Sequence, residues 1–303
     1  MSSDISFFTP VYRSNSSTMQ GLVEGYFHLS GETAYVVDQV EQADLGVVVF
    51  HEKGSLFMTA LKIASYFTLF VPILMLVAKA VLRSSHRYHI IDVKQQLEEG
   101  MEITPETIKK IETLIPKIIE GENDPDLIWH VNHGTFFNIR TFSLASMPNR
   151  IFKVPPPTWS IFREKTTITS KQMIEESFEN ALKGKKICLL YNLSQLIIPH
   201  QKVFEMDIQG QRMPVLMQEQ IGIENSVGDT EELYYISTLS RAISQLTTFI
   251  TKTGFSSVTY ETIPIIAERE NFPGDRRVAL VNLEEMDNAA QGLAKLQQLG
   301  LVN

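Results

Sequence analysis

The sequence contains little cysteine and little positive charge. Because Cys188 is the single cysteine, it cannot form an internal disulfide. It lies in the apolar run 187–190, which is typical of a buried structural thiol. Lys and Arg number 27 against 35 Asp and Glu, and no basic run is present. Because nucleic-acid phosphates are bound by clustered Lys and Arg, the composition argues against a nucleic-acid partner. His130 and His133 have no carboxylate or cysteine at ligand spacing, which argues against a zinc site.

The sequence also falls just short of a full-length hydrophobic span. Residues 63–78 form an uncharged stretch of sixteen residues, whereas a membrane-spanning helix usually needs about 20. If the flanking Lys62 and Lys79 extend toward lipid headgroups, the stretch 61–82 reaches the usual length. Pro72 then predicts a kink or a re-entrant bend.

The alternative for this stretch is a buried helix of a soluble protein. Such a helix usually carries a polar stripe, and here only Ser65, Tyr66 and Thr68 are polar. We therefore expect residues 56–90 to associate with a membrane, as a span, a hairpin or an in-plane helix. Basic residues are more numerous after the stretch than before it, so the positive-inside rule predicts that the C-terminal part faces the cytoplasm.

Residues 1–55 are expected to form a flexible lead followed by a small β-rich segment. The first 20 residues are rich in Ser, Thr and Asn, and they lack the basic start and cleavage site of a secretory signal. Two β-prone runs, 33–37 and 46–50, follow and are separated by turns. Further along, residues 104–121 begin with Thr-Pro-Glu and end on a glycine, which predicts an amphipathic packing helix.

Extended runs and a helix then follow in an informative order. Residues 127–155 contain short extended runs, residues 169–182 predict a helix that ends at Gly184, and residues 201–219 predict two strands joined by a glycine turn. Strand, strand, strand, helix, strand, strand is the order of a protein-kinase small lobe, which this region resembles. The resemblance implies a small lobe within residues 91–222.

A second resemblance to the kinase fold lies near the end of the chain. Residues 254–266 and 277–286 read as a turn, a strand, a polar loop and a second strand, in the frame of a kinase catalytic loop and metal loop. Laid on that pattern, the catalytic aspartate falls at Ser257, the metal-binding asparagine at Thr262 and the metal-binding aspartate at Asn282. Kinase chemistry relies on these carboxylates, so the resemblance implies the fold without the reaction.

Three further residues match nucleotide-binding positions of that family. Lys153 matches the strand-three lysine, which binds nucleotide phosphates and pairs with a helix glutamate, here Glu176. Gly134 stands where the family has a Gly-rich loop, and one glycine makes a poor phosphate cradle. A surface lysine and a solvated acidic helix face are the plainer interpretations. Glu284, two residues beyond Asn282, is a candidate metal ligand in place of the missing aspartate.

The large lobe is expected to be reduced. Residues 230–251 predict one long helix, and residues 287–301 follow the metal-loop segment. We therefore expect residues 223–303 to form a large lobe without the helices that bind peptide substrates in active kinases.

Taken whole, the sequence is similar to an uncharacterised family of chlamydial proteins. The similarity rests on three hydrophobic blocks, Phe-Phe-Thr-Pro-Val-Tyr at 7–12, the region 65–84, and Ala-Leu-Val-Asn-Leu-Glu at 279–284 with the preceding Ile-Pro-Ile. The family supplies no established activity.

The sequence thus predicts an α+β protein with a degenerate, truncated kinase-like fold, preceded by a hydrophobic membrane-associated segment. The leading hypothesis is a non-catalytic, pseudokinase-type interaction module that is tethered to a membrane, binds a protein partner and needs no cofactor. One alternative is a phosphotransferase that binds ATP and magnesium through Lys153 and Glu284. Another is a structural membrane-associated protein with no nucleotide role.

Overall fold

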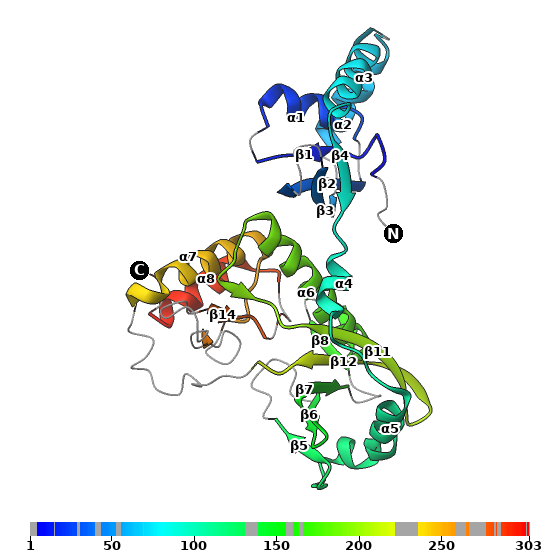
Figure 1. Ribbon diagram of the computed structural model, residues 1–303, viewed down its shortest axis with the longest axis vertical. Coiled ribbons are helices and arrows are strands. Elements are labelled where there is room, and N and C mark those ends of the chain that lie inside the picture. The colour runs from blue at the N-terminus through cyan, green and yellow to red at the C-terminus, as the bar shows by residue number, and fades with distance from the viewer. Residues whose placement is uncertain are drawn as a thin grey trace. The chain divides into compact units, whose positions relative to one another are not determined.

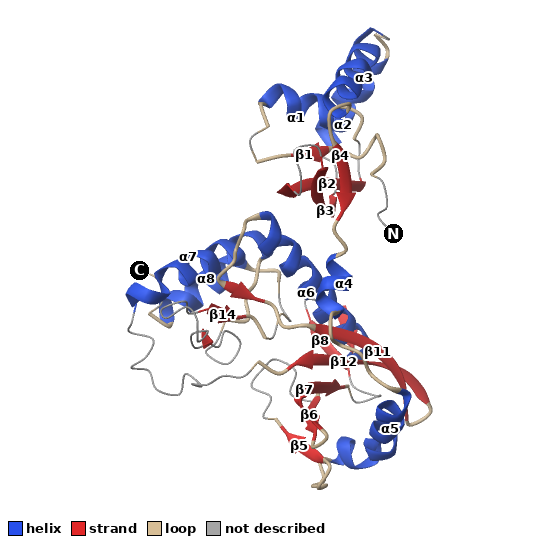
Figure 2. Ribbon diagram, in the orientation of Figure 1, coloured by secondary structure: helices blue, strands red, loops and turns tan. Residues whose placement is uncertain are grey.

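The computed structural model describes residues 5–302, except 15, 29–30, 40–43, 53–55, 69, 131–138, 156–159, 164–165, 222–235, 259–264, 267–276, 282, 284–285 and 301. The chain divides into two compact units. Unit 1 is Met1–Val93 with Leu189–Asn192, and unit 2 is Lys94–Cys188 with Leu193–Asn303. Helices and strands occur in both, so the fold class is α+β, as the sequence predicted (Figures 1 and 2). The expected β-rich and hydrophobic segments share unit 1, and the two expected lobes share unit 2.

Unit 1 is built on a four-stranded sheet with the order β1-β2-β3-β4. Its strands are β1 (Val11–Tyr12), β2 (Gly31–Gln39), β3 (Asp44–Glu52) and β4 (Arg87–Ile90). The two predicted β-prone runs lie in β2 and β3, which pair antiparallel, whereas β1 and β4 join the edges as parallel partners. Buried side chains of Val11, Ala34 and Val47 form the centre of this sheet.

The N-terminal segment is folded rather than flexible. Helix α1 (Thr18–Gly25) begins after Ser17, whose side chain accepts from the backbone N–H of Gln20. The Gln20 side chain in turn accepts from the backbone N–H of Ser17, so two N–H groups at the helix start are satisfied. The prediction of a flexible lead is therefore wrong for β1 and the start of α1, because the polar residues there cap a helix.

The hydrophobic stretch forms two helices, α2 (Leu56–Tyr66) and α3 (Phe70–Arg83), rather than one. A turn separates them, in which the Thr68 hydroxyl donates to the carbonyl of Ser65. Pro72 lies in the first turn of α3, where backbone N–H groups have no intrahelical partner, so it causes no mid-helix kink. Within the described residues, no helix has both the length and the apolar character needed to cross a bilayer.

Unit 2 contains a five-stranded antiparallel sheet with the order β11-β12-β7-β6-β5. Its strands are β5 (Leu127–Trp129), β6 (Arg140–Leu144), β7 (Met147–Val154), β11 (Gln201–Ile208) and β12 (Gln211–Glu219). The last two of these strands, β11 and β12, form the predicted hairpin. Its turn contains Gly210, which has a φ of 81°. The third of these strands along the chain, β7, therefore pairs with the fifth, β12. The chain between the third and fourth strands contains a long helix, Ser170–Leu190.

Helix α5 (Pro105–Glu120) confirms the predicted packing helix. Thr104 caps its first turn, and Gly121 ends it in the left-handed conformation, with a φ of 73°. Its apolar face packs on one face of the five-stranded sheet, against Phe142 and Phe152 among others. These two rings stack with their centroids 5.6 Å apart at the centre of the unit 2 core.

Helix α6 (Ser170–Leu190) runs well past the predicted end at Gly184. A Cβ at Gly184 would lie 2.8 Å from Ile198 and 3.1 Å from the ring of Phe249. This glycine therefore permits a close approach of two segments inside the unit and does not stop the helix. Cys188 is part-buried near the end of α6, and burial raises the pKa of its thiol to about 12.

The remaining elements of unit 2 surround a short three-stranded sheet with the order β10-β14-β13. Helix α7 (Ile236–Thr253) begins within the predicted long helix, and α8 (Ala289–Gln298) packs against it. The strands are β10 (Leu196–Ile197), β13 (Ile265–Ile266) and β14 (Arg277–Ala279). A hairpin, β8 (Ser160–Arg163) and β9 (Thr166–Thr169), and the short helix α4 (Val93–Glu98) complete the described elements.

Candidate functional site

The five-stranded sheet of unit 2 has one apolar face and one face with buried polar side chains. Because side chains alternate along a strand, the residues opposite the α5-covered face include Lys153, its cross-strand neighbour Thr141, and Gln218. The polar face is defined here by its buried polar residues, which are Thr141, Ser143, Lys153, Gln201 and Gln218.

Lys153 is the centre of this polar face. It is only 7% exposed, so it is not the surface lysine of the plainer interpretation. Glu176, its expected partner, lies on the exposed face of α6, and the two described side chains do not form an ion pair. Buried positions of the same helix are taken by apolar residues and by Ser177. The structure therefore brings Lys153 into the interior without bringing Glu176 to it.

Two hydrogen bonds tie the polar face to other segments. The Nε2 atom of His130 lies 2.7 Å from the hydroxyl of Ser143, and burial lowers the pKa of this histidine. The amide of Gln218 donates to the carbonyl of Val281 at 3.1 Å. Val281 directly precedes Asn282, so the end of β12 lies beside the metal-loop-like segment. The buried hydroxyl oxygen of Thr141 hydrogen-bonds to none of the described residues.

The catalytic-loop-like segment is packed into unit 2. Ser257 is 6% exposed, so its hydroxyl does not face an open site. Gly254 has a φ of 80°, and its carbonyl accepts from the backbone N–H of Asn288 at the start of α8. Phe255 and Met286 form an isolated antiparallel bridge. The predicted positions Gly134, Thr262, Asn282 and Glu284 lie outside the described residues, and the described part of the chain contains no cluster of potential metal ligands.

A second polar centre lies in unit 1, where helix α3 turns its charged residues inward. Lys79 is 0% exposed and donates to the carbonyl of Glu24 at 2.9 Å. Arg83 binds the Glu24 carboxylate with two nitrogens, at 2.6 and 3.1 Å. Burial lowers the pKa of Lys79 to about 8, although the nearby carboxylate opposes this shift. The carboxylate also accepts from the backbone N–H of Val11, which joins α1, α3 and β1.

The opposite side of α3 is apolar and exposed. Five of its exposed apolar residues follow the helical spacing i, i+3, i+4, i+7 and i+11, and Phe70, the first of the five, is 73% exposed. Leu76 and Ala80 are exposed as well. Phe67, in the turn before α3, is 85% exposed. We define the outer stripe as the five helical residues, which are Phe70, Ile73, Leu74, Val77 and Val81. Helix α3 is thus inverted relative to an ordinary surface helix, since its charges are buried and its apolar stripe is exposed.

The lysines that flank the hydrophobic stretch do not extend toward a headgroup layer. Both are bound to other groups of unit 1. Lys62 donates to the carbonyls of Gly25 and His28, at 2.7 and 2.6 Å. Lys79 is enclosed with Glu24. Carbonyls and a carboxylate from α1 and the turn after it, distant in the sequence, satisfy both ammonium groups, so the condition under which the stretch 61–82 reaches a spanning length is not met.

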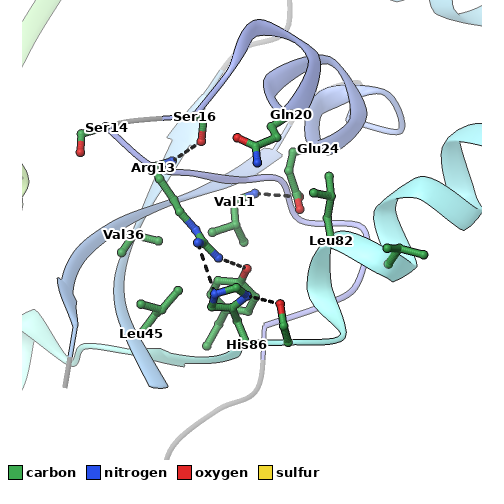
Figure 3. Close-up of a pocket in the computed structure, with 13 residues that line it drawn as sticks. Val11, Arg13, Ser14, Ser16, Gln20, Glu24, Val36, Leu45, Leu82 and His86 are labelled. Carbon is green, nitrogen blue, oxygen red and sulfur yellow. Dashed lines mark hydrogen bonds between the residues drawn. The ribbon is translucent and has the colours of Figure 1, made fainter. Parts of the chain in front are cut away.

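A pocket of about 600 Å³ is lined by residues of α1, of α3 and of all four strands of the unit 1 sheet. Arg13 crosses it, with one Nη atom donating to the hydroxyl of Tyr88 at 3.0 Å and the other 3.4 Å from Nε2 of His86 (Figure 3). Glu24 lines one side, and Val81 of the outer stripe lines another. Serine hydroxyls of Ser14, Ser16 and Ser85 add polar groups to the wall.

Comparison with known proteins gave no match to a family model, a curated protein or a solved structure. The similarity to chlamydial proteins therefore stays a prediction from the sequence, and the arguments for function rest on the geometry of the two units.

Sequence reasoning did not find the Glu24 network or the pocket. Glu24 and Lys79 are 55 residues apart, and each belongs to a segment whose local pattern gives no sign of the other. One signal was present: Lys79 and Arg83 are four residues apart on α3, which places them on the same helix face. That face is the one opposite the apolar stripe, so an inward-facing charged pair could have been predicted.

Proposed function

We propose that the protein is a peripheral membrane protein, in which unit 1 inserts the outer stripe of α3 into a lipid surface and unit 2 is a non-catalytic, kinase-like interaction module. The observation that carries the proposal is the inverted helix α3. In a membrane environment, ionisable side chains face the protein and pair with one another, while apolar side chains face lipid. Lys79 and Arg83 on one side and the outer stripe on the other follow that rule.

Attachment in the plane of the bilayer fits the dimensions better than a span. Helix α3 covers Phe70–Arg83, which is short of the roughly 20 residues needed to cross the hydrocarbon layer. Burial of one helix face at the boundary between headgroups and acyl chains requires no such length. A protein interface would be expected to include a polar rim, whereas the described residues from Ile63 to Ala78 carry no charged side chain.

The kinase-like reading of unit 2 is supported by its topology. Along the chain, three strands of the five-stranded sheet come before helix α6 and two come after it, with the β8–β9 hairpin inserted before the helix and the short strand β10 after it. Lys153 lies on the third strand, where kinases carry their phosphate-binding lysine. The hydrogen bond from Gln218 to the carbonyl of Val281 adds a contact between the last strand and the metal-loop-like segment. Buried Ser257 argues against catalysis at the matching position, since serine cannot serve as the carboxylate base.

Membrane attachment is tested by introducing charge into the outer stripe. Leu74→Asp combined with Val77→Asp should weaken binding to phosphatidylcholine vesicles by about 100-fold or more, because two apolar side chains worth about 1.5–3 kcal/mol each are lost from lipid and two charges are added. Both positions are 54% exposed, so the variant should fold like the wild type. Co-sedimentation with vesicles measures the partition.

Ser146→Asp combined with Asn149→Asp is the matched control, since it adds the same charge at exposed positions in unit 2. Equal partition of the wild type and the outer-stripe variant would refute membrane attachment through α3. If the wild type instead forms oligomers that the outer-stripe variant dissolves, as light scattering would reveal, the stripe is a protein interface and the membrane proposal fails.

The non-catalytic assignment of unit 2 is tested with ATP and magnesium. Because Ser257 and Asn282 stand where kinases carry the carboxylates for the base and for magnesium, we expect no change in melting temperature at millimolar ATP and magnesium. Lys153→Met, which keeps an aliphatic stem in the buried position, serves as the comparison. A rise in melting temperature of the wild type that is lost in Lys153→Met would favour the alternative function, a nucleotide-binding phosphotransferase.

A further inference from the structure

The pocket of unit 1 has the features of a preformed receptor for an anion. A guanidinium group has five N–H donors in a fixed fork, which suits the oxygens of phosphate or carboxylate. Arg13 uses two of its nitrogens on Tyr88 and His86, which are neutral partners when the histidine is deprotonated. Within the described residues, no carboxylate forms an ion pair with Arg13. Among the described residues, its half-buried positive charge therefore has no directly bound carboxylate, and Glu24 of the same pocket wall is bound elsewhere.

The surroundings of Arg13 keep this charge in place. The Nδ1 atom of His86 lies 2.8 Å from the hydroxyl of Ser85, which fixes the orientation of the ring that faces Arg13. Burial and the neighbouring guanidinium lower the pKa of His86, so the ring is held neutral and does not repel Arg13. The backbone N–H of Arg13 donates to the Ser16 hydroxyl at 3.1 Å, which fixes the start of the side chain as well. Figure 3 shows the Arg13 side chain directed toward His86 in the pocket.

The only carboxylate in the pocket wall, among the described residues, is already neutralised. Glu24 is bound by Arg83 at 2.6 Å and faces Lys79 at 3.5 Å, so two positive charges stand against its one negative charge. Arg13 adds a further positive charge on the cavity side. Arg13, Lys79 and Arg83 together with Glu24 therefore carry a net positive charge, although the whole chain carries a net charge of -8.

We propose that this pocket binds a phosphate group, and that the phosphate of a lipid headgroup is the source favoured by its position. A volume of about 600 Å³ is enough for a phosphorylated headgroup. Val81 belongs both to the pocket wall and to the outer stripe, so the cavity opens beside the surface proposed to enter lipid. This inference rests on the proposed membrane attachment for the source of the phosphate, but not for the anion site itself.

The test compares vesicles of phosphatidylcholine alone with vesicles that also contain phosphatidic acid. The wild type should bind the second kind more tightly, and Arg13→Gln should lose about tenfold or more of that gain, because charge-assisted hydrogen bonds are stronger than neutral ones. Arg13→Gln should bind pure phosphatidylcholine vesicles like the wild type. Arg87→Gln is the matched control, since it removes the same charge at an exposed residue of β4 outside the pocket.

A second variant and a soluble probe test the phosphate site without depending on the folding of Arg13→Gln alone. Ser14→Glu places a carboxylate on an exposed part of the pocket wall and should also abolish the gain. Glycerol 3-phosphate should raise the melting temperature of the wild type but not of Arg13→Gln. If that shift occurs without any gain on phosphatidic acid, the site takes a soluble phosphate instead of a headgroup.

Retention of the gain by both pocket variants, together with no Arg13-dependent shift by glycerol 3-phosphate, would overturn the inference. If the wild type binds no vesicles at all, membrane attachment fails, and the anion site is then decided by the glycerol 3-phosphate titration alone.

Discussion

Glu24→Gln should destabilise unit 1 by about 3–5 kcal/mol, the usual penalty for removing one partner of a buried ion pair. The substitution leaves Lys79 and Arg83 facing each other without a carboxylate, and Lys79 has no exposure to water. It also weakens the acceptor for the backbone N–H of Val11, on which the pairing of β1 depends. Urea denaturation followed by far-ultraviolet circular dichroism measures the change, because both tryptophans of the chain belong to the range of unit 2.

Glu32→Gln is the control for this prediction, because it makes the same chemical change at an exposed residue of β2. It should alter stability by less than about 0.5 kcal/mol. Adding Lys79→Met to Glu24→Gln should recover part of the loss, since one uncompensated charge is then removed from the interior. A Glu24→Gln protein as stable as the Glu32→Gln control would mean that the network does not hold unit 1 together.

Phe152→Ala should destabilise unit 2 by about 3–5 kcal/mol, as deletion of a fully buried aromatic ring usually does. The ring is 0% exposed and stacks on Phe142, with the centroids 5.6 Å apart. Its loss opens a cavity between α5 and the five-stranded sheet, and the stacking contact is lost as well. Thermal unfolding monitored by circular dichroism measures the change.

Asn149→Ala provides the matched control, because it truncates an exposed side chain on the same strand. Little change is expected there. A loss below about 1 kcal/mol in Phe152→Ala would indicate that α5 and the sheet collapse around the missing ring, and that the packing of unit 2 is less specific than the structure implies.

Local signals predicted the elements that local chemistry determines. The helix over 104–121 was predicted from Thr104, Pro105 and Gly121, and each acts at its own end of α5 through the backbone. The hairpin at Gly210 needed only two β-prone runs and a residue that tolerates positive φ. In both cases the residues that decide the structure lie within one turn of the position they determine.

The misreadings involve residues whose role depends on a distant partner. Glycine commonly follows a helix end, which is why the sequence predicts one at Gly184. In the structure this glycine instead leaves room for Ile198 and Phe249, which belong to later segments of the chain. Lys79 lengthens the hydrophobic stretch only if it extends to a lipid headgroup, yet Glu24 encloses it. Of the polar face, the sequence predicts only Lys153 as a notable residue. Thr141 and Gln218 lie near it because of the strand register, which the alternation of side chains along a strand does not determine.

The state of Cys188 has a practical consequence for locating the membrane contact. A thiol whose pKa is raised to about 12 carries almost no thiolate at neutral pH, so it reacts slowly with maleimides and related reagents. We therefore expect Cys188 to label more slowly than an exposed cysteine placed elsewhere, which a labelling time course of the unsubstituted chain checks. Single cysteines placed along α3 can report depth and polarity one residue at a time, and they would map which turns of the helix leave water.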